Sequence, residues 1–157
     1  MCVLVVGSVA LDTVETPFGS RAETLGGSAT YFSMSASYFA PVKVVAVVGE
    51  DFPEPHVKLL EERGIDLSGL SRRPGRTFRW KGRYSQLLAD AQTLDTQLNV
   101  FEHFEPQLPV GCRSAPFVFL GNIDPVLQRQ VLDQIERPKL VAADTMNFWI
   151  NGKPEEL

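Results

Sequence analysis

The sequence has few of the residues that build metal sites and disulfide frameworks. It contains only two cysteines, Cys2 and Cys112, and two histidines in 157 residues. Neither cysteine belongs to a C-x-x-C pair or to another spacing typical of zinc ligands. The sequence therefore indicates neither a disulfide framework nor a zinc site, and we predict no metal ligand within it. This cysteine usage favours a reducing, intracellular setting.

Basic clusters and long apolar runs are missing as well. Lys and Arg number 15 against 19 Asp and Glu, which gives a formal net charge of −4. No basic run could neutralise a row of phosphates. The chain has no stretch of about 18 uninterrupted apolar residues, and the opening MCVLVVGSVALD lacks the basic start of a signal peptide. We therefore expect a cytoplasmic protein that binds neither nucleic acid nor membrane.

Two common nucleotide-binding motifs are also absent. The sequence has no G-x-x-x-x-G-K-[ST] loop, and the turn after its first apolar run, GSVALD, does not match G-x-G-x-x-G. The first absence argues against a P-loop enzyme. The second weakens the case for a nucleotide-dependent oxidoreductase.

Short apolar runs alternate with helix-forming stretches along most of the chain. Hydrophobic residues make up 44% of the sequence, which is enough for a core. The apolar runs cover residues 2–6, 42–48, 115–120 and 139–143. Helical patterns cover residues 25–40, 53–63 and 124–135, and a last one begins at residue 148. This alternation predicts an α/β domain in which the four runs share one mostly parallel sheet, with a short edge segment at residues 65–70.

Alternating polar and apolar residues predict a second, smaller sheet. Residues 13–25 alternate around Gly19 as a hairpin does, and residues 77–85 and 93–102 alternate like strands with one wet face, separated by a polar connection. We expect these strands to stand off the main sheet as a lid. The aromatic residues Phe78, Trp80 and Tyr84 give the lid an apolar face. That face could be core, cover a ligand or contact another subunit.

The segment from Leu25 to Ala40 is the strongest candidate for a binding site. Its glycine pair, Gly26 and Gly27, allows positive φ and close approach of another molecule to backbone N–H groups. Ser28 and Thr30 can cap the helix that follows. Unpaired N–H groups in the first helical turn suit hydroxyl, carboxylate or phosphate oxygens. The alternative is a tight turn followed by a core helix.

Three polar residues follow the ends of predicted strands, namely Asp12, Asp51 and Asn122. Open α/β sheets bind ligands at the carboxyl ends of their strands. We therefore expect Asp12 and Asn122 to converge with the glycine pair on a cleft between the sheet and the lid. The alternative for Asp12 is a solvated loop carboxylate. Asp51 suits ligand binding and helix capping equally.

Taken in order, these motifs resemble the N-terminal half of the PfkB or ribokinase-like carbohydrate kinases. The first strand is followed by G-S-x-x-x-D, a glycine pair opens a helix, and the next strand ends in V-G-x-D. Lid strands then interrupt the α/β pattern, and a later strand leads to a region similar to D-x-N. The residues that match are Gly7, Ser8, Asp12, Gly26, Gly27, Val48, Gly49, Asp51, Asp144 and Asn147.

The resemblance implies a ribokinase-like fold for residues 1–157, a mostly parallel Rossmann-like sheet flanked by helices with lid strands at about 13–25 and 76–102. It implies an ATP-dependent kinase acting on a small sugar or nucleoside. ATP and Mg²⁺ are implied for the full-length enzyme, with no ligand for either assignable in this chain. A homodimer through the lid is the protein partner that it allows. The implied substrate-binding residues are Asp12, Gly26, Gly27, Asp51 and Asn122.

The sequence departs from the family pattern at three points. The glycine-pair motif G-G-x-x-x-N has Tyr31 at the asparagine position, and the spacing from Asp144 to Asn147 is one residue longer than D-x-N. The D-T-x-G-A-G-D motif that carries the family's catalytic aspartate is missing. We therefore expect only the substrate-binding half here, with the ATP-binding half and the catalytic base absent. The alternative is a non-catalytic sugar-binding or interaction module from a truncated kinase-like chain.

Overall fold

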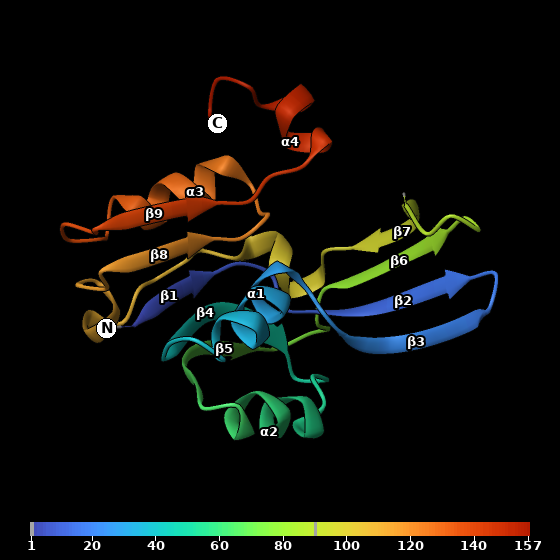
Figure 1. Cartoon of the computed structure of the whole chain (residues 1–157), viewed down its shortest axis with the longest axis horizontal. Helices are drawn as coiled ribbons and strands as arrows, with labels where there is room; N and C mark the ends of the chain where they lie inside the picture. Colours follow the sequence, from blue (N-terminus) through green and yellow to red (C-terminus); the bar gives the residue numbers. More distant parts are fainter. Residues whose placement is uncertain (1, 90) are drawn as a thin grey trace.

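The computed structural model describes residues 2–89 and 91–157 and contains two separate sheets. The main sheet has five strands in the order β5-β4-β1-β8-β9, and the lid sheet has four in the order β3-β2-β6-β7. Figure 1 shows the main sheet on the left and the lid on the right. This arrangement confirms the predicted division into an α/β body and a small β lid.

All strand pairs of the main sheet are parallel. The four predicted apolar runs form four of its strands. The predicted edge segment is the fifth, and it is longer than expected because its pairing with β4 continues as far as Arg73. The strands are β1 (Val3–Val6), β4 (Val42–Gly49), β5 (Ile65–Arg73), β8 (Phe117–Leu120) and β9 (Leu140–Ala143).

Helices cover both faces of the main sheet, so its central strands are apolar on both sides. On β4, Val45 and Val47 belong to one buried cluster, whereas Val44 and Val48 belong to the other. The second cluster is closed by α1 (Ser28–Ala36) and α2 (Glu54–Glu62). The first is closed by α3 (Pro125–Leu132) and by two short 3₁₀ helices, η1 (Asn99–His103) and η2 (Val110–Cys112).

Local signals set the helix ends. Gly64 follows α2 with a φ of 71°, the left-handed conformation that glycine adopts most easily. Asp124 caps α3 by accepting a hydrogen bond from the Val126 N–H at 3.0 Å. The last helix, α4 (Asn147–Gly152), begins one residue before the predicted position 148. No helix within residues 2–89 and 91–157 is long and apolar enough to cross a membrane.

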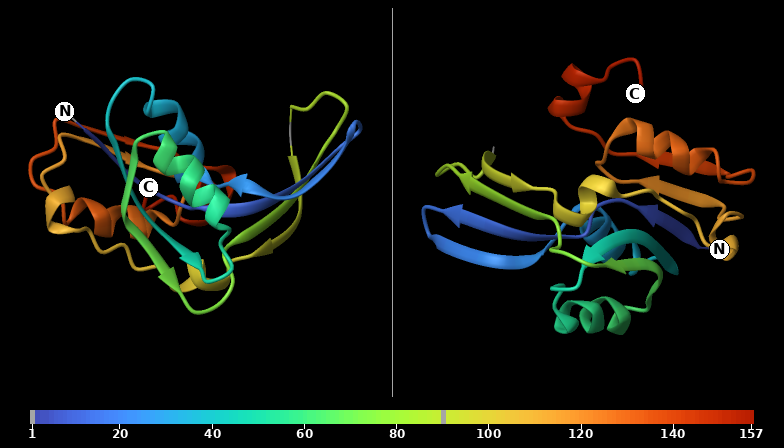
Figure 2. Two further views of the ribbon diagram at one scale, coloured as in Figure 1. Left: turned by 90° about the horizontal axis from the view of Figure 1, so that it is seen from below. Right: turned by 180° about the vertical axis from the view of Figure 1, so that it is seen from behind.

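The lid consists of two hairpins joined side by side. The first is β2 (Ala10–Thr16) with β3 (Gly19–Gly26), and the second is β6 (Arg79–Tyr84) with β7 (Ala91–Gln97). Both hairpins are antiparallel, and β2 and β6 join them in parallel. Figure 2 shows the lid extending from the body and curving to one side.

The prediction of one strand over residues 93–102 is wrong. Strand β7 ends at Gln97, and Asn99 takes a left-handed φ of 51° at the start of η1. The chain turns there because Phe101 and Phe104 pack into the core beneath the main sheet. All seven residues of β7 are exposed, so the strand has two wet faces rather than one. Asp90, in the predicted polar connection before β7, lies outside the described residues.

Candidate functional site

Asp12 lies on β2, and its carboxyl group packs against Gly26 on the neighbouring strand β3. Ala10 pairs with Gly26 and Asp12 pairs with Thr24, so the Asp12 side chain and Gly26 share one face of the lid. A Cβ atom on Gly26 would overlap the Asp12 carboxylate. Gly26 is therefore glycine because Asp12 needs that space. The expected alternative of a solvated loop carboxylate is wrong, because Asp12 is a half-buried strand residue.

Gly27 completes the junction between the lid and α1. It takes a φ of 96°, and a Cβ atom there would overlap the Ser8 carbonyl. Burial raises the pKa of Asp12 to about 6, and a hydrogen bond from the Gly27 N–H partly offsets this increase. The predicted glycine pair thus holds a carboxyl group that changes its charge just below neutral pH.

The start of α1 does not offer all the free N–H groups that we expected. Ser28 N–H donates to Ser8 Oγ at 3.0 Å, and Ala29 N–H donates to the Ser8 carbonyl at 3.0 Å. Gly27 is the N-cap, without a capping side chain, and Thr30 Oγ1 is buried with no partner among the described residues. The expectation that Ser28 and Thr30 cap the helix is therefore wrong. The loop after β1 supplies the partners.

Asn122 follows β8 at the same end of the main sheet as this junction. The preceding residue, Gly121, packs so closely that a Cβ atom on it would lie 3.2 Å from Gly7 Cα and 2.5 Å from Ser28 Oγ. Asn122 Oδ1 is buried and has no hydrogen-bond partner within residues 2–89 and 91–157. A buried acceptor without a donor costs about 1–3 kcal/mol, so Asn122 Oδ1 is an unfavourable feature that the described residues do not compensate.

Asp51 follows β4, and both its carboxylate oxygens are bound by groups of the chain. Oδ1 accepts the Thr77 N–H and the Thr77 hydroxyl, each at 2.7 Å, and Oδ2 lies 2.8 Å from Arg79 Nη2. Burial raises the pKa of Asp51, but the hydrogen bonds from Thr77 and Arg79 outweigh it, and the net pKa is lowered. Asp51 does not cap α2, whose N-cap is Pro53.

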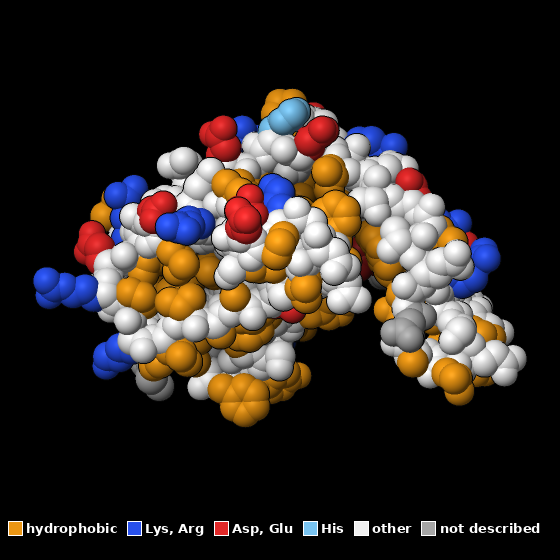
Figure 3. Space-filling model, turned by 90° about the horizontal axis from the view of Figure 1, so that it is seen from above, with side chains coloured by type: hydrophobic (Ala, Val, Ile, Leu, Met, Phe, Trp, Pro, Cys, Tyr) orange, Lys and Arg blue, Asp and Glu red, His pale blue; other side chains and the backbone are white. Residues whose placement is uncertain are grey.

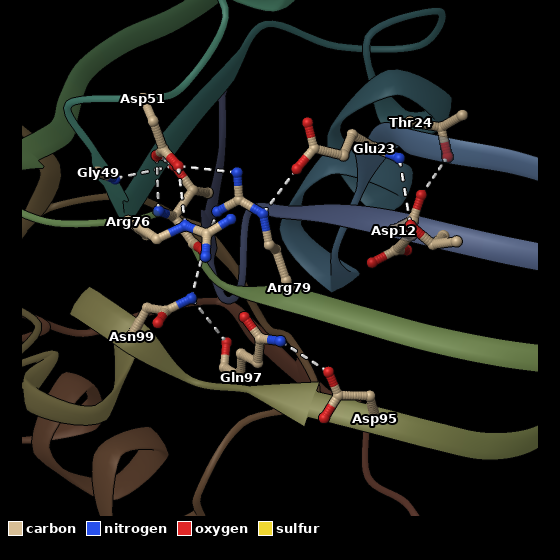
Figure 4. A network of polar contacts seen from close by, with 12 residues as sticks. Asp12, Glu23, Thr24, Gly49, Asp51, Arg76, Arg79, Asp95, Gln97 and Asn99 are labelled. Atoms are coloured by element: carbon tan, nitrogen blue, oxygen red, sulfur yellow. Dashed lines mark hydrogen bonds and ion pairs between the residues drawn. The ribbon is translucent and has the colours of Figure 1, made fainter.

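Arg79 extends these contacts into the lid. Its Nε donates to Glu23 Oε1 on β3 at 2.8 Å, and its side chain is only 15% exposed. Figure 4 shows Arg79 between Asp51 and Glu23, with Asp12 nearby on the adjacent strand. The roles of Thr77, Arg79 and Glu23 could not be predicted from the sequence, because their partners lie 26 to 56 residues away.

The structure therefore brings the predicted residues together unequally. Asp12, Gly26 and Gly27 are in direct contact, and Asn122 lies at the same end of the main sheet. Asp51 reaches the junction only through Arg79 and Glu23. The half-buried carboxyl group of Asp12 can accept hydrogen bonds from the hydroxyl groups of a small molecule. In the part of the chain that the structure describes, no three His, Cys, Asp or Glu side chains cluster to hold a metal ion.

Comparisons with known proteins found a curated relative over part of the chain and solved structures with a similar fold. No family model matches the sequence. The cytidine kinase of Thermococcus kodakarensis is 36% identical over 76 residues, which cover 48% of this chain and 27% of that protein. The chain spans about a quarter of this curated relative and about half of the solved structures that it matches.

Three solved structures illustrate the likeness. The nucleoside kinase of Methanocaldococcus jannaschii, an archaeal member of the ribokinase family, has a TM-score of 0.76 at 17% identity, covering 99% of this chain and 56% of that one. Burkholderia thailandensis nucleoside kinase, in complex with inosine, has a TM-score of 0.65 at 10% identity, covering 85% and 58%. Cryptococcus neoformans ribokinase, in complex with ADP, has a TM-score of 0.62 at 16% identity, covering 75% and 41%. The chain has the fold of the ribokinase family of carbohydrate and nucleoside kinases.

Proposed function

We propose that this chain is the N-terminal, substrate-binding half of a kinase that transfers the γ-phosphate of ATP to a hydroxyl group of a small sugar or nucleoside. The observation that carries the proposal is the Asp12 carboxyl group, held between Gly26 and the Gly27 N–H where lid and body meet. The fold and the named activities of its relatives support it. A non-catalytic sugar-binding module would use the same carboxyl group, so the preference for a kinase rests on the named activities of these relatives.

Each site residue has a separate role in this proposal. Asp12, ionised above about pH 6, accepts hydrogen bonds from substrate hydroxyl groups. Gly26 leaves the space that this carboxylate fills, and Gly27 donates its N–H to it. Asn122, whose Oδ1 lacks a partner among the described residues, is assigned to a further hydroxyl group. We assign Asp51 a positioning role, because its oxygens already hold Thr77 and Arg79.

ATP is the proposed phosphoryl donor because the fold neighbour from Cryptococcus neoformans was crystallised with ADP. Phosphoryl transfer depends on Mg²⁺ and on groups that stabilise charge around the γ-phosphate. The described residues do not fit these roles, since they contain no metal-binding cluster and the sequence lacks a glycine-rich anion loop. We therefore assign ATP, Mg²⁺ and the catalytic base to the part of the enzyme outside these 157 residues.

Calorimetric titration with pentoses, hexoses and nucleosides tests the substrate side. We expect Asp12→Ala to weaken binding about 10- to 100-fold, because hydrogen bonds to a charged acceptor contribute roughly 1.5–3 kcal/mol. Asp95→Ala is the matched control, since Asp95 is an exposed lid carboxylate whose side chain contacts Gln97. Unchanged affinity in the Asp12 variant for every ligand that binds would overturn the proposal.

We also propose that the lid can pair with a second copy of the chain. Strand β7 is one of the two edge strands of the lid, and all seven of its residues are exposed. Unpaired N–H and C=O groups along such an edge favour pairing with another strand. Sedimentation at increasing concentration tests this proposal. A mass that stays at 17.4 kDa would contradict it.

A further inference from the structure

The two faces of the lid differ in chemistry. Asp12 pairs with Trp80 and Val14 pairs with Gly82, whereas Glu15, one residue on, pairs with Arg83. Because side chains alternate along a strand, Asp12, Val14 and Trp80 share one face. The other face carries the remaining charged side chains of β2 and β6, namely Glu15, Arg79, Lys81 and Arg83.

The charged face is occupied by its own ion pairs. Glu15 binds Lys81 and Arg83, each at 2.7 Å, and Glu23 binds Arg79 at 2.8 Å. Figure 3 shows Lys and Arg side chains along the outer side of the lid and a hollow between the lid and the body, with hydrophobic side chains around it. The face that carries Asp12 is therefore the one available to a ligand.

Trp80 is fixed as a flat surface on that face. Its indole Nε1 donates to Thr93 Oγ1 on β7 at 3.2 Å. Its ring lies over Gly82, where a Cβ atom would overlap the indole carbons. The ring is only half-buried. The hydrogen bond to Thr93 and the packing on Gly82 fix the Trp80 ring, and part of its surface stays exposed to solvent. Such a ring can stack on another flat group without rearranging.

Tyrosines from two elements approach the same space. Tyr31 lies in the first turn of α1 with 62% of its surface exposed. Burial raises the pKa of its phenol, and the charges of Asp12 and Tyr84 add to this increase. Tyr84 ends β6 on the same face as Trp80. Trp80 and Tyr84 therefore line the lid face that carries Asp12, and together with the exposed ring of Tyr31 we call them the aromatic wall.

We infer that this aromatic wall, formed by Trp80, Tyr84 and Tyr31, binds a nucleobase, so that the substrate is a nucleoside rather than a free sugar. A free sugar offers an aromatic ring only the small patch formed by its C–H bonds and presents hydroxyl groups elsewhere, whereas a nucleobase offers a flat aromatic surface. This face instead provides one carboxyl group beside aromatic rings. The inference rests on the proposed function, in which Asp12 holds the sugar hydroxyl groups of the same ligand.

The test uses the two tryptophans of the chain, Trp80 and Trp149. In a Trp149→Phe background, Trp80 is the remaining indole, and we expect cytidine to quench its fluorescence while ribose does not. Trp80→Leu should weaken cytidine binding about 5- to 100-fold, the range for loss of one base–aromatic stack, and leave ribose affinity unchanged. Trp80→Phe should retain most of the affinity. Affinities of the Trp80 variants are measured by calorimetry.

A second variant keeps the test decisive if Trp80→Leu does not fold. Tyr31→Asn changes an exposed side chain, so folding should survive, and we expect cytidine to bind several-fold more weakly while ribose does not. Ribose binding as tightly as cytidine, with no effect of either variant, overturns the nucleobase inference. If that ribose binding still requires Asp12, the proposed function stands. Binding of neither ligand, or binding independent of Asp12, overturns both.

Discussion

Arg79 on β6 holds Asp51 after β4 with its guanidinium 2.8 Å from the carboxylate, so one ion pair joins the lid to the main sheet. Asp51 also accepts two hydrogen bonds from Thr77, a residue that is fully buried. The lid is thus held by contacts that involve charge, and its attachment should respond to pH.

We expect Asp51→Asn to lower the free energy of unfolding by about 1–2 kcal/mol at pH 7, because charge-assisted hydrogen bonds become neutral ones. The pKa of Asp51 is lower in the folded chain than its ordinary value of 3.8. Its ionised form therefore stabilises the fold above pH 3.8, and this stabilisation is lost as the pH falls through the lowered pKa. Urea denaturation at pH 7 and pH 3 measures the difference, with Asp95→Asn as control. Equal losses at both pH values would contradict this account.

Asp12 should show the opposite pH dependence. Its pKa is raised from 3.8 to about 6, so the fold favours the protonated form, and stability falls as the pH rises from about 4 to 6. Asp12→Asn should therefore stabilise the chain at pH 8, by about 1–2 kcal/mol after allowance for partial exposure, and give no gain near pH 4. Thermal unfolding at the two pH values measures this. A gain of the same size at pH 4 would show that the carboxylate charge is not responsible.

Substrate binding should follow the ionised form of the same group. Lowering the pH through about 6 protonates Asp12, so the affinity for a sugar or nucleoside should decrease below that pH. Titrations from pH 5 to pH 8 measure the decrease, and Asp12→Asn should bind weakly with little pH dependence. A wild-type affinity that is constant across this range would remove Asp12 from the site.

Gly26→Ala should destabilise the chain by about 1–3 kcal/mol and weaken substrate binding, because the new methyl group displaces the Asp12 carboxyl group. Adding Asp12→Gly to the Gly26→Ala variant should restore stability, because removing the carboxyl group leaves room for the new methyl group. It should not restore binding, because the carboxylate that accepts the substrate hydroxyl groups is lost. Gly152→Ala is the control, because a Cβ atom there meets nothing within 4 Å. A second substitution that restores no stability would show that the two residues are not coupled.

The chain alone should not phosphorylate any substrate, since the groups that would hold the γ-phosphate and Mg²⁺ are missing from its sequence. An ATP-consumption assay over pentoses, hexoses and nucleosides should show no substrate-dependent ADP. Turnover of about 1 s⁻¹, ordinary for an enzyme, would contradict the expectation and make Asp144 the first candidate for the base.

The sequence predicted the features that depend on local pattern. Buried parallel strands are rich in β-branched residues, as in VKVVAVVG of β4, and this pattern predicted the strands of the main sheet. The position of Asp12 after the first strand led us to expect it beside the glycine pair, but the contact arises from the antiparallel pairing of β2 with β3 in the lid.

Features that depend on distant partners were missed. Phe101 reads as a strand residue until the core beneath the main sheet is available to receive it. We expected free N–H groups at the start of α1, because their partner Ser8 lies 20 residues earlier and no local pattern indicates the contact. The same holds for Arg79, whose role depends on Asp51 and Glu23 on two other segments.

The chain passes between the body and the lid four times, from β1 to β2, β3 to α1, β5 to β6 and β7 to η1. A lid joined by a single linker can rotate freely about it. Four connections restrict the lid to bending as one unit relative to the body. Because β2 is seven residues and thus about 23 Å long, a bend of about 10° at its base moves its tip by about 4 Å. A stiff lid of this kind would convert a small rearrangement at the Arg79 anchor into an ångström-scale displacement of its tip relative to the body.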